Sequence, residues 1–289
     1  MPVLTGRPTA AVIIGASSGI GRATTLRLAG DGVHVLLTGR APEVLEDVAD
    51  ACRALGSTAS VVTHDVRDAE AVERVISEAA AEHGRDLAVM HSAAVAAYGL
   101  VEEVPPDLMS SVVETNVLGT IAVTRSAMNA FRRTGGGHLV VVGSLLGQVA
   151  APYMSSYVLS KWAVHAFERT LQIEARDHEG GSVSLIAPGG IDTPIYRQAA
   201  TVLGRHSTPT PPVRTAEDVA DPGCRGAEAP APPDARRGGQ PNRGGRVPSA
   251  TNGVRRHRHP RPAHLRPRHL ARSRHDRGQR RGATAPTAG

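Results

Sequence analysis

The sequence predicts an α/β protein built on a doubly wound parallel sheet, followed by a basic C-terminal tail that we expect to be disordered. Short apolar runs alternate with segments of helical spacing as far as about residue 200. Most of these runs lack the polar alternation of a half-exposed strand, which is typical of parallel strands covered on both faces. A glycine-rich segment, GASSGIG, joins the first apolar run to the first helical segment.

The expected strands and helices follow one another in turn. Strands are expected at residues 10–15, 33–39, 60–65, 86–94, 138–144 and 182–190. Helices are expected at residues 20–31, 42–55, 69–83, 107–133 and 153–178. Gly56 and Gly84 follow two of these helices, and three glycines follow the helix that ends at residue 133, as is common at helix C-termini. Parallel neighbours need right-handed crossovers, so helices should cover both faces of the sheet.

Composition narrows the class of protein. Of the 289 residues, 40% are hydrophobic and only 2% are aromatic. The two cysteines imply no disulfide framework, so we expect a cytoplasmic protein. The N-terminal MPVLTGRP has no signal-peptide pattern, and no apolar run approaches the roughly 20 residues of a membrane span. We therefore expect no membrane contact, and we predict no metal site.

Charge divides the chain into two parts. From Arg205 onward there are 18 arginines, no lysine and six acidic residues, whereas the preceding part is net negative, so the overall charge of +6 describes neither part. We expect a nucleotide-binding and catalytic domain at residues 1–204 and the remnant of a substrate loop at residues 205–221, with Thr215 as a helix N-cap. Residues 222–289 are expected to be a disordered tail rich in Arg, Pro and Gly.

Three interpretations of the tail remain open. It could bind nucleic acid or another anionic surface through salt-sensitive attraction. It could be an extension without function, or the product of a reading frame that shifted near residue 221. The last is favoured because Asp221-Pro222-Gly223 interrupts an expected helix and no strand candidate follows. Nucleic-acid binding is the least expected of the three.

The glycine-rich turn and the end of the second strand predict a dinucleotide site. Glycines permit a tight turn and a close approach to a phosphate, and the helix N-terminus offers unpaired N–H groups and the positive end of its dipole. The second strand ends in Thr38-Gly39-Arg40. An arginine there suits a 2′-phosphate, whereas an acidic side chain suits a free ribose hydroxyl, so we expect NADP(H) before NAD(H). Arg22 is expected to help, and a plain glycine turn with a solvated arginine is the alternative.

Tyr157 and Lys161 give the strongest catalytic signal. Lys161 is the only lysine of the chain, and on a helix it shares a face with Tyr157, four residues before it. A free phenol titrates at a pKa of about 10, and a neighbouring ammonium should lower that value. A surface lysine beside a core tyrosine is the alternative, disfavoured because Ser144 ends the preceding strand at the ligand edge of the same sheet.

These motifs resemble those of the short-chain dehydrogenase/reductase family over residues 8–204. The matching segments are GASSGIG from Gly15, Asp65-Val66, NVLGT from Asn116, Ser144, Tyr157 with Lys161, and PGGIDTP from Pro188. Each is a weak signal alone, but the order and spacing are specific. The resemblance implies a Rossmann-type fold, a nicotinamide cofactor, oxidation of a secondary alcohol or reduction of a ketone, and a homo-oligomer, whose interface the altered C-terminal part would change.

The resemblance also implies residue roles. Tyr157 would exchange a proton with the substrate oxygen, and Ser144 would hold that oxygen. Lys161 would bind the nicotinamide ribose and lower the pKa of Tyr157. Asn116 would hold a water that links Lys161 to solvent. The implied cofactor-binding residues are Gly15, Ser17, Ser18, Gly19, Ile20, Gly21, Arg40, Asp65, Val66, Ala93, Tyr157, Lys161, Pro188, Gly189, Ile191 and Thr193.

The sequence departs from the family pattern at the first and fourth strands. Ile14 stands where the family usually has threonine, and His91-Ser92-Ala93-Ala94 stands where it has Asn-Asn-Ala-Gly. We expect weaker cofactor binding from these changes but the same reaction, with His91 as a strand residue and not a catalyst.

The main functional expectation is an NADP(H)-dependent oxidoreductase for a small to medium-sized apolar carbonyl or alcohol. The approach to the catalytic serine is expected to be lined by Leu145, Leu146, Gln148, Ala150, Tyr153 and Met154. The alternatives are a cofactor-binding protein without turnover and a nucleic-acid-binding module based on the basic tail.

Overall fold

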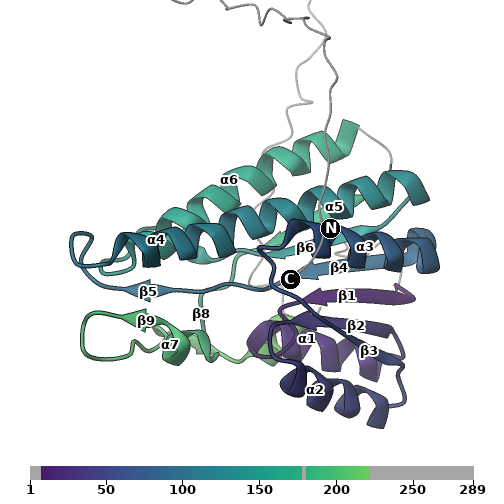
Figure 1. The fold of residues 1–289 in the computed structure, drawn as a ribbon, viewed down its shortest axis with the longest axis horizontal. Helices are drawn as coiled ribbons and strands as arrows, with labels where there is room; N and C mark the ends of the chain where they lie inside the picture. The colour runs from purple at the N-terminus through teal and green to yellow at the C-terminus, as the bar shows by residue number, and fades with distance from the viewer. Residues whose placement is uncertain (1–7, 178–179, 222–289) are drawn as a thin grey trace, which may run out of the picture. The chain divides into compact units, whose positions relative to one another are not determined.

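The computed structural model describes residues 8–177 and 180–221 of the chain (Figure 1). The predictions for the tail, residues 222–289, concern positions that lie outside the described residues, and the same holds for the end of the expected helix at residue 178.

A six-stranded parallel sheet forms the centre of the described part. Its strand order is β3-β2-β1-β4-β6-β7, and every pairing is parallel. The strands are β1 (Ala10–Ile14), β2 (His34–Gly39), β3 (Ala59–Thr63), β4 (Leu87–His91), β6 (His138–Val142) and β7 (Ser182–Ile186). The strand order reverses between β1 and β4, where sheets of this kind bind ligands outside the carboxyl ends of the strands. The predicted doubly wound α/β fold is confirmed.

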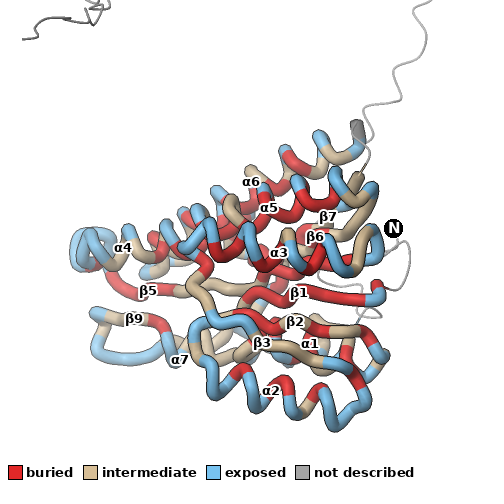
Figure 2. The backbone as a smooth tube through the Cα atoms, turned by 45° about the vertical axis from the view of Figure 1, so that its right-hand side comes forward, coloured by how far each residue is buried: buried red, intermediate tan, exposed pale blue. Residues whose placement is uncertain are grey.

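Helices cover both faces of this sheet (Figures 1 and 2). The main helices are α1 (Gly19–Gly30), α2 (Pro42–Ala54), α3 (Ala69–His83), α4 (Pro106–Val113), α5 (Gly119–Thr134) and α6 (Ser155–Asp177). Every residue of β1 is buried. Its Ala11 and Ile13 pack with α1 and α2, whereas Val12 and Ile14 pack with α3, α5 and α6. Burial on two sides explains why the strands read as continuous apolar runs.

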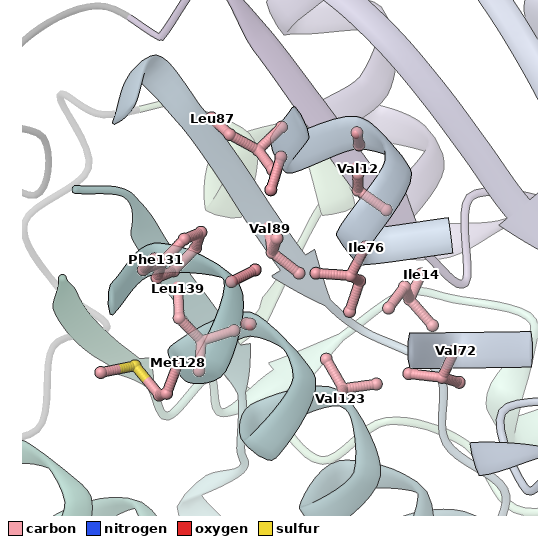
Figure 3. Close-up of a cluster of buried hydrophobic side chains, with 14 of the residues drawn as sticks. Val12, Ile14, Val72, Ile76, Leu87, Val89, Val123, Met128, Phe131 and Leu139 are labelled. Carbon is pink, nitrogen blue, oxygen red and sulfur yellow. The ribbon is translucent and has the colours of Figure 1, made fainter. Parts of the chain in front are cut away.

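The buried cluster on the α3–α5 face fixes the helices near the site (Figure 3). It joins Val12 of β1 to Ile76 of α3 and Phe131 of α5, all of them fully buried. Val164 and Leu171 of α6 belong to the same cluster. Because protein cores are close-packed, this cluster holds the helix that carries Tyr157 and Lys161 in one position against the sheet.

The expected helix at residues 107–133 is interrupted. α4 ends at Val113, a π-helical turn, η2, occupies Glu114–Leu118, and α5 begins at Gly119. Asn116 lies in this turn. Apolar spacing does not distinguish one wide turn from a continuous helix, so the sequence predicts a single helix. π turns occur often at functional sites, where they redirect a side chain.

Several short elements lie between the main strands and helices. They were not predicted, because segments of two to four residues show no periodicity. They include the 3₁₀ turns η1 (Gly84–Asp86) and η3 (Leu145–Gly147). β5 (Ala97–Tyr98) pairs with β9 (Ala200–Thr201), and β8 (Gly190–Ile191) pairs with β10 (Val213–Arg214). The short helix α7 covers Ile195–Gln198.

The last described helix, α8 (Ala216–Ala220), confirms Thr215 as an N-cap. The Thr215 hydroxyl accepts from the Asp218 backbone N–H at 3.1 Å, and the Asp218 carboxylate accepts from the Thr215 N–H at 3.0 Å. This reciprocal pair is a capping box. Ala216 packs in one small cluster with Ala23 of α1 and Ile191 of β8.

No helix of residues 8–177 and 180–221 is both long and apolar enough to cross a bilayer. The same residues contain no group of three His, Cys, Asp or Glu side chains placed to hold a metal ion.

Glu168 is a fully buried carboxyl between α5 and α6. Thr124 of α5 donates a hydrogen bond to Glu168 Oε1 at 2.9 Å, and Oε2 has no hydrogen-bond partner among the described residues. Burial raises the pKa of Glu168 to about 7, and the Thr124 hydrogen bond acts against this rise.

We expect Glu168→Gln to change how stability depends on pH. In the wild-type protein, the free energy of unfolding should fall as pH rises from the ordinary carboxyl pKa of 4.5 to about 7, because the unfolded chain ionises first. Above that range the whole cost, about 3 kcal/mol, is present. Glutamine carries no such cost, so urea unfolding should show a gain for the variant at pH 8 that is largely absent at pH 5. Glu174→Gln, at an exposed position of α6, is the control, and a pH-independent difference for Glu168→Gln would contradict the prediction.

Candidate active site

A cavity of about 540 Å³ opens at the carboxyl ends of the sheet strands. Its lining includes the residues that follow β1, β2, β3, β4, β6 and β7. All the predicted catalytic and cofactor-binding residues line this cavity except Asn116. The structure therefore brings together motifs that are separated by up to about 180 positions in the sequence.

The glycine turn between β1 and α1 packs too closely for side chains. Gly15 has φ +92°, and a Cβ atom there would lie 2.7 Å from the backbone nitrogen of Ala93. A Cβ on Gly21 would lie 2.1 Å from the carbonyl oxygen of Gly15. Distances below 3 Å are not tolerated by backbone atoms, so both positions require glycine. The short Ser92 hydroxyl donates to the carbonyl oxygens of Ile14 and Gly15 at 3.2 and 3.3 Å and ties the turn to β4.

The N-terminus of α1 faces the cavity and is not capped by an acidic side chain of its own first turn. Ser18 is the N-cap, but its side chain makes no capping hydrogen bond, and the first turn contains no acidic residue. Ser17, Ser18, Gly19 and Ile20 all line the cavity. The first-turn N–H groups and the positive end of the helix dipole are therefore directed at the cavity. These residues fit a cofactor that carries phosphate groups.

The end of β2 supplies positive charge to one end of the cavity. Arg40 lines the cavity, is exposed, and has no acidic partner within ion-pair distance among the described residues. Asp65 lies nearby, and Arg67 donates to both of its carboxylate oxygens, at 2.8 and 3.1 Å. Arg67 holds the pKa of Asp65 below its ordinary value, and Arg40 adds to that effect. Arg22 is exposed on α1 but does not line the cavity, so the structure does not bring it to the site.

Ser144, Tyr157 and Lys161 meet at the other end of the cavity. Ser144 follows β6 and accepts a hydrogen bond from the Leu146 N–H at 3.1 Å. Its side chain is a neighbour of the Tyr157 hydroxyl, whose pKa it lowers. The Lys161 Nζ donates to the carbonyl oxygen of Val142 at 3.0 Å and lies 5.6 Å from the centre of the Tyr157 ring. Lys161 is only 5% exposed. The predicted shared face of Tyr157 and Lys161 is present.

The predicted lowering of the Tyr157 pKa is wrong for this structure. Burial raises the pKa of Tyr157 above its ordinary value, the side chain of Ser144 acts against this rise, and the neighbouring Tyr196 and Tyr98 raise it further. Burial also lowers the pKa of Lys161 to about 8. The prediction considered only the attraction between ammonium and phenolate, whereas desolvation of the phenolate by burial is the largest influence on this pKa.

Asn116 lies behind the cavity wall and clamps two segments together. Its Oδ1 accepts from the Val95 N–H at 2.8 Å, and its Nδ2 donates to the Val95 carbonyl oxygen and to Ser160 Oγ, both at 2.9 Å. Ser160 Oγ in turn donates to the carbonyl oxygen of Tyr157 at 2.7 Å. Asn116 therefore connects the segment after β4 to the helical turn that carries Tyr157. Its role in holding a water near Lys161 stays a prediction.

His91 is a buried residue of β4, as predicted. Its Nε2 lies 3.0 Å from the Thr120 hydroxyl, which donates its hydrogen to the Asn116 carbonyl oxygen at 2.6 Å. Because that hydrogen is used, the His91 Nε2 must be the donor. Burial, with a smaller effect of the Lys161 charge, lowers the pKa of His91 to about 3. The imidazole is therefore neutral at physiological pH.

The walls around Ser144 differ in part from the prediction. Leu145, Leu146 and Met154 line the cavity as predicted. Gln148, Ala150 and Tyr153 do not line it, and Val149 and Ala151 do. After η3, Val149 and Ala151 therefore take the places at the cavity that were predicted for Gln148 and Ala150.

Sequence reasoning also missed the part of the wall that comes from distant segments. Tyr98 of β5, Ile195 and Tyr196 of α7, Ala199 and Ser207 line the cavity. Pairing of β5 with β9 brings these segments together. No motif marks such short strands, and Tyr98 and Tyr196 are about 100 residues apart in the sequence, so no sequence signal joined them.

Comparison with known proteins agrees with this geometry. A family model described as short chain dehydrogenase matches residues 9–202. The cattle (Bos taurus) protein named dehydrogenase/reductase SDR family member 7B is 32% identical over 204 residues, which are 68% of this chain and 62% of the relative. This chain thus spans less than two thirds of the length of that relative.

Two solved structures resemble the described fold. One is an alcohol dehydrogenase from the archaeon Thermococcus sibiricus complexed with 5-hydroxy-NADP, with a TM-score of 0.63, 29% identity, and coverage of 73% of this chain and 87% of the other. The second is a short chain dehydrogenase/reductase from Burkholderia phymatum in complex with NAD, with a TM-score of 0.65, 26% identity, and coverage of 74% and 83%.

The parallel sheet order, the glycine turn and the cavity at the strand ends define a Rossmann-type α/β protein. Within that class, the chain belongs to the short-chain dehydrogenase family.

Proposed function

We propose that this chain is an NADP(H)-dependent oxidoreductase that interconverts a ketone and a secondary alcohol. The observation that carries the proposal is the meeting of Ser144, Tyr157 and Lys161 at one end of a cavity whose other end fits a dinucleotide. A bound nicotinamide would supply or accept the hydride. The protein supplies a proton, a hydrogen bond to the substrate oxygen and a fixed orientation.

In the reduction direction, Tyr157 is the proton donor. Its raised pKa keeps the phenol protonated at neutral pH. A carbonyl oxygen placed beside the hydroxyls of Ser144 and Tyr157 would accept a hydrogen bond from each, and Tyr157 would pass its proton to that oxygen as negative charge develops there. Lys161, near the Tyr157 ring, then stabilises the phenolate that remains. Because the groups are buried, this electrostatic stabilisation is stronger than it would be in water.

Asn116 acts in this proposal as a positioning residue. It contacts Val95 and Ser160, and Ser160 contacts the backbone of Tyr157. These bonds link the π turn to the helical turn that carries Tyr157. Catalytic groups need geometry held to within a fraction of an ångström, which such supporting bonds provide.

The choice of NADP(H) over NAD(H) rests on Arg40. The two solved relatives carry an NADP derivative in one case and NAD in the other, so they do not decide between the cofactors. Arg40 is exposed at the cavity and has no acidic partner in the described ranges. Arg67 forms ion pairs with Asp65 and Glu114, which leaves Arg40 as the positive charge available to a 2′-phosphate. A 2′-phosphate would bind Arg40 through charge-assisted hydrogen bonds.

Arg40→Ala is expected to raise the Kd for NADPH by about tenfold or more and to change the Kd for NADH by less than about threefold, because a hydrogen bond to a charged group contributes about 1.5–3 kcal/mol. Fluorescence titration with the two cofactors measures both constants. Arg22→Ala removes the same charge from an exposed position outside the cavity and should leave both constants unchanged. Equal weakening of NADPH and NADH by Arg40→Ala would contradict the choice of cofactor.

The proposed reaction is tested with a panel of ketones and secondary alcohols and both cofactors. Oxidation of NADPH that depends on an added ketone supports it. Tight cofactor binding with no turnover of any carbonyl compound would instead favour a cofactor-binding protein without this activity. The walls near Ser144, which include Leu145, Leu146, Val149 and Met154, support an apolar substrate of small to medium size.

A homo-oligomer and a cytoplasmic location are part of the proposal. Leu159, Trp162 and Ile173 lie on α6 with 50–56% of their surfaces exposed, which supports a contact between copies of the chain. The buried, unpaired thiol of Cys52 accords with a reducing compartment.

A further inference from the structure

Three of the four tyrosines of the chain line one end of the cavity. Tyr98, Tyr157 and Tyr196 come from β5, α6 and α7 and line the cavity together, whereas Tyr153 does not. Tyr98 belongs to a small packed cluster against which Tyr157 and Tyr196 also pack. Only 2% of the residues are aromatic. A chain with so few aromatic side chains thus places three of them together in the wall of the cavity near Ser144.

Each of these tyrosine hydroxyls has a polar neighbour within the protein. The Ser207 side chain lowers the pKa of Tyr98, the Ile191 backbone lowers the pKa of Tyr196, and Ser144 lowers the pKa of Tyr157, each against a larger rise caused by burial. Ser207 lines the cavity together with Tyr98. Tyr98 and Tyr196 therefore offer a ligand mainly their rings and not their hydroxyls.

The charges of the cavity favour a neutral partner for these rings. Aromatic side chains also bind cations. However, the single acidic residue that lines the cavity within the described ranges is Asp65, and Arg67 already occupies both of its carboxylate oxygens. Lys161 adds a positive charge beside Tyr157. A cationic ligand would meet no counter-charge here, whereas a neutral aromatic ring gains edge and face contacts.

We infer that the substrate carries a neutral aryl group next to its carbonyl or carbinol carbon, and that Tyr98 and Tyr196 recognise this group through their rings. The inference rests on the proposed function for the identity of the reacting group. Tyr157 keeps its role at the oxygen, and the two other tyrosines act as specificity residues.

A matched pair of ketones tests the aryl site. Phenyl methyl ketone and cyclohexyl methyl ketone are similar in size and differ in the aromatic ring. We expect kcat/KM to favour the phenyl ketone by about 3- to 10-fold, the range that aromatic pairing contributes beyond area burial. Tyr196→Leu and Tyr98→Leu should bring this ratio close to one. Tyr196→Phe, which keeps the ring and loses the hydroxyl, should preserve the ratio, as should Tyr153→Leu at the tyrosine outside the cavity.

Binding of the two corresponding alcohols gives a second readout that needs no turnover. Titration of the NADP⁺-loaded protein with 1-phenylethanol and 1-cyclohexylethanol should show the same preference and the same response to Tyr196→Leu. An aryl preference in binding without turnover would contradict the proposed reaction and support the aryl site. A ratio within about twofold of one in the wild-type protein, or one that Tyr196→Leu and Tyr98→Leu leave unchanged, would overturn the inference.

Discussion

Tyr157→Phe is expected to lower kcat for ketone reduction by about 10³-fold, within the range that a positioned proton donor contributes. The substitution removes one oxygen atom and keeps the ring that packs against the cluster of Ala96, Tyr98 and Ala199. The carbonyl oxygen would keep the hydrogen bond of Ser144 but would receive no proton. Because the phenol takes little part in holding the cofactor, the Kd for NADPH should change by less than about threefold, the effect of one weak neutral contact. Steady-state kinetics and cofactor titration measure the two quantities.

Tyr153→Phe is the matched control for this experiment. Tyr153 lies four positions earlier, is half exposed, and does not line the cavity. Its variant should keep the wild-type kcat. A Tyr157→Phe enzyme with more than about a tenth of the wild-type kcat would exclude Tyr157 as the proton donor, since general acid catalysis contributes at least about 10²-fold.

Lys161→Met is expected to remove activity and stabilise the fold. We expect kcat/KM to fall by about 10²-fold or more, because the buried ammonium near the phenol is lost. The pKa of Lys161 is lowered from 10.5 to about 8 by burial, so the folded protein disfavours the charged form. This cost is fully present below about pH 8 and decreases as pH rises from 8 towards 10.5, because the folded protein releases the proton first. Methionine carries no such cost.

The pH dependence of stability separates this effect from packing. The gain in unfolding free energy of Lys161→Met over the wild-type protein should be larger at pH 7 than at pH 9, by about 1 kcal/mol. Urea unfolding at the two pH values measures it. A change in packing alone would shift stability equally at both, so an identical difference would contradict the assignment of a buried, desolvated ammonium to Lys161.

The long periodic segments of this chain were predictable, and the reasons are visible in the structure. β1 is buried on both sides, so its apolar run stood out. The glycine turn was recognisable because Gly15 and Gly21 meet backbone atoms at distances that exclude any side chain. Lys161 could be recognised from the sequence because the chain contains no other lysine.

The features that escaped prediction depend on contacts between distant segments. The π turn at Asn116 has the same apolar spacing as a helix. Tyr98 lies in β5 and Tyr196 lies in α7, just before the partner strand β9, and strands of two residues have no recognisable pattern. The pKa of Tyr157 depends on how completely the phenol is buried, which spacing along a helix does not reveal.

The short helix α8 lies after the last motif of the sequence and still packs beside the predicted cofactor site. Ala216 touches both Ala23 of α1 and Ile191 of β8, and these two elements flank the cofactor cavity. The five-residue helix contributes no residue to the lining of the cavity, yet it belongs to the packing that supports two of its walls.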